Sequence, residues 1–177
     1  KLEGDAAFFY CDHNGDKDQA NKILVAMDKA NKAFNEKASS LVFVQACGCE
    51  PCLESKNLRL KIVAHNGNFA IKQIRNFEEL AGEDVILTHR MLKNDIESNE
   101  YWLVTDNFYK DLSLENKSKF SPNTQNLESF GKMKLNYLQL SSPEPKNSKI
   151  ENRSRIYNWF AQALYFSKAK FGKKSIQ

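Results

Sequence analysis

The sequence lacks long hydrophobic runs. No stretch of its 177 residues approaches the roughly 18 consecutive apolar residues that a membrane-spanning helix needs. The first residues also lack the charged and apolar segments of a secretory signal. The mean hydropathy is −0.60 and hydrophobic residues make up 41% of the chain, as in ordinary soluble domains. We therefore expect one globular domain with a sizeable core and no membrane span, located in the cytoplasm.

The chain also lacks a strong excess of charge of one sign. Its 26 lysines and arginines face 22 acidic residues, which gives a formal net charge of +4. Much of the excess falls late, in Lys146–Arg155 and Lys168–Lys174. Surfaces that bind nucleic acid carry a denser basic stripe than this. We expect no nucleic-acid partner and interpret the basic segments as promoting solubility.

Cysteine is scarce, and three of the four cysteines, Cys47, Cys49 and Cys52, crowd into six residues. That spacing does not suit a disulfide framework and favours thiols in a reducing compartment. A Cys-x-Cys-x-x-Cys loop opened by glycine and proline offers soft ligands for a structural zinc ion. The alternatives are free buried thiols or an adventitious disulfide. The sequence leaves the fourth ligand open between the residues Cys11, His13 and His65.

Apolar periodicity predicts strands and helices without any internal repeat. A buried strand is expected at 6–11, and a helix at 19–37 that either continues through 41–44 or is followed there by a short strand. The Asn66-Gly67 pair predicts a hairpin turn between strands at 58–65 and 69–74. Further along, we expect helices at 83–94, 107–112 and 153–171, strands at 101–105 and 132–140, an exposed loop at 113–130 and a linker at 141–152. The order indicates an α+β or α/β domain on a largely antiparallel sheet.

Two short motifs offer chemistry. The first is Lys1-Leu2-Glu3-Gly4-Asp5, in which an aspartate at a strand edge can hold Mg²⁺ and a lysine can meet a base or a phosphate. In the second, Gly82 precedes an acidic helix start and Arg90 follows about two turns later, where it can reach a phosphate. Taken singly, each motif is better explained as an ordinary glycine turn or as a capped helix with a solvent-facing arginine.

Taken together and in order, these motifs resemble the class III adenylate/guanylate cyclase homology domain. The resemblance covers residues 1–112 and extends to the strand at 132–140. It is closest to an uncharacterised bacterial branch that shares Glu3–Ala6, Cys47–Cys52 and Gly82–Asn94. The resemblance implies a ferredoxin-like fold, two Mg or Mn ions, a purine nucleoside triphosphate as ligand and a homodimer. The domain then spans 1–140, followed by a linker at 141–152 and a C-terminal amphipathic helix with a basic tail at 153–177.

The resemblance also implies roles for individual residues. Asp5 matches the second metal-binding aspartate, Lys1 and Glu79 match the positions that read the purine, and Arg90 matches the arginine that stabilises the transition state. It further implies that the first metal-binding aspartate lies on a strand that, with two helices, precedes residue 1. Ile86 stands where the family has a ribose-orienting asparagine. We therefore expect nucleotide binding with weak or lost cyclisation.

Two other functions remain open. The first is a non-catalytic nucleotide-binding or protein-interaction module that uses the cyclase fold with a structural zinc loop, which Ile86 and Cys47–Cys52 favour. The second is a peripheral membrane anchor formed by the basic, aromatic helix at 153–174. We regard packing of that helix on its own sheet as the better explanation.

Overall fold

The structure is a computed structural model that describes residues 2–3, 5–13, 15–44, 57–75, 77–140, 159–160 and 163–164. Lys1, the cysteine loop at 47–52 and the linker at 141–152 lie outside these residues. Of the predicted C-terminal helix, the pairs 159–160 and 163–164 are described, and both are helical and exposed. In the described part of the chain, no helix has both the length and the apolar character needed to cross a membrane.

A four-stranded sheet forms the centre of the fold, in the order β3-β6-β8-β7. Its strands are β3 (Lys61–Ala64), β6 (Tyr101–Thr105), β8 (Gly131–Gln139) and β7 (Ser121–Leu127). β3 runs parallel to β6, and the other two pairs are antiparallel. The expected α+β class with a mostly antiparallel sheet is therefore confirmed.

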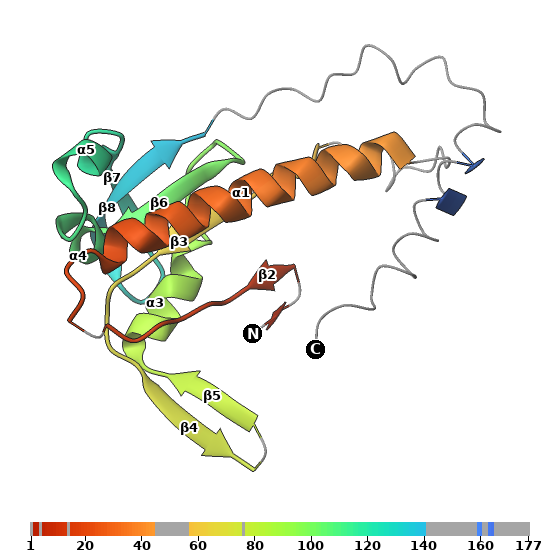
Figure 1. Ribbon diagram of the computed structural model, residues 1–177. Coiled ribbons are helices and arrows are strands. Elements are labelled where there is room, and N and C mark those ends of the chain that lie inside the picture. The colour runs from red at the N-terminus through yellow and green to blue at the C-terminus, as the bar shows by residue number, and fades with distance from the viewer. Residues whose placement is uncertain are drawn as a thin grey trace.

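Helices cover both faces of this sheet (Figure 1). α1 (Gln19–Val44) and α4 (Asp106–Lys110) pack on one face, and α3 (Glu83–Met91) packs on the other. A short helix, α5 (Leu114–Lys117), follows α4. All five residues of β6 are buried, because their side chains alternate between the two cores. Trp102 and Val104 join the α1 side, and Tyr101 and Leu103 join the α3 side.

Two small hairpins complete the described elements. β1 (Leu2–Glu3) pairs with β2 (Ala6–Ala7), and β4 (Ala70–Ile74) pairs with β5 (Phe77–Ala81). The β4–β5 hairpin extends away from the central sheet below α3, and every side chain of β4 is exposed (Figure 1). The chain then enters α3 through Gly82, whose φ of 150° favours glycine.

The predicted hairpin between 58–65 and 69–74 is wrong. β3 ends before the Asn66-Gly67 pair and pairs with β6 in parallel, while β4 pairs with β5. The reason is burial on two faces. Ile62 packs on the α1 side of the sheet and Val63 on the α3 side, which an isolated hairpin does not provide.

The predicted loop at 113–130 is also wrong, because it contains α5 and β7. Although the segment is polar, its residues 121–127 form an edge strand with alternating burial. Gln125 and Leu127 are buried, and their neighbours in the sequence are exposed. Ser113 caps α5, since its side chain accepts a hydrogen bond from the Asn116 N–H.

The helices predicted at 19–37, 83–94 and 107–112 are confirmed with shifted limits. α1 starts where expected and continues through 41–44, which settles that alternative in favour of helix. α3 is shorter than predicted, and its buried face carries Leu87 and Met91, while Ile86 and Leu92 are exposed. The strands at 101–105 and 132–140 and the short helix near 107–112 are confirmed within one or two residues.

The predicted buried strand at 6–11 is wrong in the structure. Only Ala6–Ala7 are in a strand, and the Phe9 side chain is 86% exposed. Aromatic contacts hold the chain after β2 against other segments. The Phe8 ring stacks on His89 at 5.2 Å, and the Tyr10 ring meets Phe69 edge-on at 5.3 Å. The segment after β2 therefore lies against α3, the helix that carries Arg90.

Candidate functional site

Asp5 lies in the turn between β1 and β2, and its side chain is exposed. The turn is short because Glu3 pairs directly with Ala6. An exposed carboxylate in such a turn is accessible to a cation that is also coordinated by the oxygens of a bound ligand. Mg²⁺ commonly binds proteins in this way, through one or two carboxylates and the phosphates of a substrate. The Asp5 carboxylate is therefore accessible to solvent.

Arg90 lies in the last turn of α3 and forms an ion pair with Glu128, which follows β7. Its position near the carboxyl end of a helix is favourable for a cation. The Arg90 side chain is 29% exposed, so part of it remains accessible to solvent. Within the described residues, no hydrogen bond or ion pair joins Arg90 to Asp5.

Glu79 and Ile86 occupy different surroundings. Glu79 is exposed on β5, opposite Lys72 of β4. Ile86 lies one helical turn before Arg90 on α3, with its side chain 52% exposed. The helix therefore presents an apolar side chain at the position where the resemblance expects an amide.

Three of the candidate zinc ligands, Cys47, Cys49 and Cys52, lie outside the described residues. Lys1, the candidate purine contact, also lies outside them. Cys11 is exposed with a free thiol, and its Sγ accepts a hydrogen bond from Gln19 Nε2 at 3.1 Å. Among the described residues, no group of three or more His, Cys, Asp or Glu side chains could hold a metal ion.

His65, predicted only as one possible zinc ligand, lies just after β3 and contacts β6 and α3 through partly buried polar groups. Its Nδ1 lies 2.9 Å from Thr105 Oγ1 at the end of β6, and its Nε2 lies 3.0 Å from Asp84 Oδ1 in the first turn of α3. Asp84 also accepts a hydrogen bond from the Asn68 N–H at 2.6 Å. A Cβ atom at Gly67 would overlap both the His65 ring and the Asp84 carboxylate, so only glycine fits there. This contact fixes the start of α3 relative to the sheet.

The pKa of Asp84 reflects this setting. Partial burial raises the pKa, but the Asn68 N–H and the adjacent His65 ring outweigh burial and hold it below its ordinary value of 3.8. The charged carboxylate is therefore favoured in the folded state.

We predict that Asp84→Asn removes a pH-dependent part of the stability. Because the folded-state pKa is lowered, this part is fully present above the unfolded pKa of 3.8 and is lost as the pH falls through the folded value. Urea unfolding of the wild type and the variant should show the largest difference near neutral pH and a smaller one at about pH 3. A difference that stays constant over this range would contradict the role given to Asp84.

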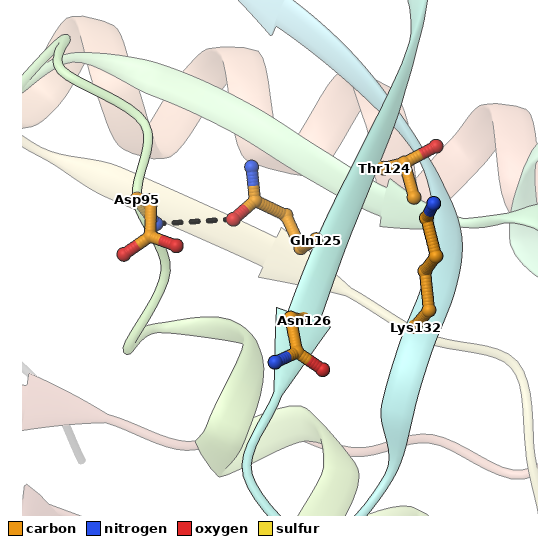
Figure 2. Close-up of a pocket in the computed structure, with 5 residues that line it drawn as sticks. All are labelled: Asp95, Thr124, Gln125, Asn126 and Lys132. Atoms are coloured by element: carbon orange, nitrogen blue, oxygen red, sulfur yellow. Dashed lines mark hydrogen bonds between the residues drawn. The ribbon is translucent and has the colours of Figure 1, made fainter.

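A shallow cavity of about 340 Å³ lies beside β7, lined by Asp95, Thr124, Gln125, Asn126 and Lys132 (Figure 2). Both polar atoms of the Gln125 amide form hydrogen bonds: its oxygen accepts one from the Asp95 N–H at 3.0 Å, and its nitrogen donates one to Asn123 Oδ1 at 2.8 Å. Because the oxygen and the nitrogen of the Gln125 amide both have protein partners, we assign no ligand to the cavity.

Comparison with known proteins gives a family. Residues 1–101 match the family described as "Protein of unknown function (DUF2652)". The chain belongs to the DUF2652 family. It is also 33% identical over 147 residues to the uncharacterized protein Rv2561/Rv2562 of Mycobacterium tuberculosis. That alignment covers 81% of this chain, which in turn spans 66% of the length of the relative. No solved structure matches the chain significantly.

The DUF2652 match runs from the β1–β2 hairpin to the first residue of β6. It includes all the candidate residues predicted from the sequence, among them Asp5, Glu79 and Arg90. Glu128 lies beyond the match and was not predicted from the sequence. Only the tertiary structure identifies Glu128, because 38 positions separate it from Arg90 in the sequence.

Proposed function

We propose that this DUF2652 protein is a class III cyclase-like domain that binds a purine nucleoside triphosphate together with Mg²⁺ or Mn²⁺. In this proposal the fold is the ferredoxin-like cyclase fold, the protein acts as a homodimer, and cyclisation is weak or lost. The observation that carries the proposal is that the Asp5 side chain on the β1–β2 turn is exposed and that the Arg90 side chain on α3 is partly exposed. Both are accessible to a ligand, as the resemblance requires.

Each residue has a distinct role in the proposed complex. Asp5 holds the metal ion, which when bound polarises the reacting oxygen and phosphate groups. Arg90 donates hydrogen bonds to phosphate oxygens through its planar fork, which matches their geometry better than a lysine does. Lys1 and Glu79 contact the purine. In the proposed homodimer, Asp5 of one subunit and Arg90 of the other complete one site.

Non-catalytic nucleotide binding is the second candidate function, and the exposed Ile86 favours it. An isoleucine cannot donate a hydrogen bond to a ribose. The ribose would then bind without being oriented for attack of its hydroxyl oxygen on the phosphate. This version includes a structural zinc ion held by Cys47, Cys49 and Cys52, with Cys11 as a further ligand. Both versions require nucleotide binding, and they differ in turnover.

We predict that Arg90→Ala weakens nucleotide binding about tenfold, because a charge-assisted hydrogen bond to phosphate is lost. The measurement is calorimetric titration of the full natural chain with ATP and with GTP in the presence of Mn²⁺. Lys93→Ala is the matched control, since Lys93 is an exposed cation just beyond α3 and has no role in the proposal. Equal loss of affinity in both variants would show that Arg90 acts only through general charge.

A further inference from the structure

The Arg90–Glu128 ion pair joins two elements that are far apart in the sequence. Arg90 comes from α3, and Glu128 comes from the turn between β7 and β8. The two side chains differ in exposure, at 29% for Arg90 and 70% for Glu128. The Arg90 side chain is therefore partly enclosed by the fold, whereas the Glu128 side chain is largely exposed and can leave its partner.

Packing sets the position of Glu128. The preceding residue, Leu127, is 2% exposed and belongs to the same buried cluster as Leu87 and Met91 of α3. The turn then closes through a hydrogen bond from the Phe130 N–H to the Leu127 carbonyl at 3.0 Å. Ser129 takes a positive φ of 70° in this turn. Glu128 is thus held over the end of α3 by its backbone, so its carboxylate meets Arg90 without a large loss of chain entropy.

The pair places a negative charge on the cation that the proposed function assigns to phosphate. Carboxylate and phosphate oxygens use the same donors of an arginine. An exposed ion pair contributes little to stability, so a more highly charged anion can replace the carboxylate. Ile86, the exposed residue one turn away on α3, offers no competing hydrogen bond.

We propose that Glu128 is the positioning residue for Arg90 and that a triphosphate displaces its carboxylate when a nucleotide binds. This inference rests on the proposed function. In the free protein, Glu128 orients the guanidinium group; in the complex, the phosphate takes over the same N–H groups. Glu128 therefore lowers the affinity of Arg90 for every anion. Only an anion with a high negative charge, such as a triphosphate, competes effectively with the Glu128 carboxylate.

Glu128→Gln tests the inference, with Glu115→Gln as the matched control. Glu115 is also an exposed glutamate with a cation nearby, Lys119, but it lies on α5. The full natural chain and both variants are titrated with ATP and with inorganic triphosphate in Mg²⁺, and thermal unfolding verifies that each is folded. We expect Glu128→Gln to bind both ligands about two- to fivefold more tightly, the range of an exposed ion pair. Glu115→Gln should bind as the wild type does.

A spectroscopic readout separates displacement from a purely structural effect. The NMR resonance of the Arg90 side-chain N–H in the wild type should shift on adding triphosphate, and it should already be shifted in free Glu128→Gln. Unchanged or weaker binding by Glu128→Gln, alongside nucleotide binding by the wild type, overturns the inference and leaves the proposed function standing. Failure of the wild type and of Glu128→Gln to bind either ligand overturns both.

Discussion

Replacing Leu103 by alanine is expected to lower the free energy of unfolding by about 2 to 5 kcal/mol. Leu103 is fully buried at the centre of β6, within the cluster that holds α3 on the sheet. Truncation removes apolar contacts and leaves a cavity that the rigid sheet cannot fill. Urea unfolding followed by circular dichroism measures the change.

Leu114→Ala is the control for this experiment. Leu114 is the same residue type, but it is 85% exposed on α5. Its truncation should change the free energy of unfolding by no more than about 0.5 kcal/mol. A comparable loss in the two variants would contradict the placement of Leu103 in the core.

Replacing Ile86 by asparagine is expected to raise cyclic nucleotide formation about 100-fold, which is the lower end of the contribution of one oriented donor in a transition state. The change restores the amide that the resemblance places one turn before Arg90. Because Ile86 is about half exposed and lies outside the buried clusters, the fold should be retained. The assay follows conversion of ATP and GTP by the full natural chain in Mn²⁺.

Ile71→Asn provides the matched control for that gain. Ile71 is 51% exposed, nearly the same as Ile86, and lies on β4. It should leave product formation at the wild-type rate. If Ile86→Asn also stays at the wild-type rate while nucleotides still bind, the non-catalytic version of the proposed function is the correct one.

Local sequence patterns predicted the elements that depend on local periodicity and caps. The apolar stripe of α1, the dense apolar run of β6 and the acidic start of α3 at Glu83 and Asp84 all appear where expected. The strand β8 was also predicted, because its alternation continues over nine residues. These signals require no knowledge of the partner element.

The errors arise where a distant partner determines the structure. The Asn66-Gly67 pair is typical of a hairpin turn, but β3 pairs with β6 instead of β4. The β4–β5 hairpin and α3 separate β3 from β6 in the sequence. The strand β7 is polar because it forms an edge of the sheet, so its composition resembles that of a loop.

The same limit applies to the candidate site. Asp5 and Arg90 could be identified from motifs, whereas the tertiary contacts of Asp84 and Glu128 around α3 could not. Asp84 was interpreted only as a helix-start residue, yet it also contacts His65, and the contact of His65 with Thr105 spans 40 positions. Glu128 carries no motif at all, and its significance comes from the turn that places it against Arg90.

Titration of the full natural chain with ATP and GTP in Mn²⁺ tests the central claim most directly. We predict saturable binding of at least one of the two nucleotides, weakened about tenfold by Arg90→Ala and unchanged by Lys93→Ala. Absence of saturable binding of both purine nucleotides to the folded wild-type protein would contradict the claim.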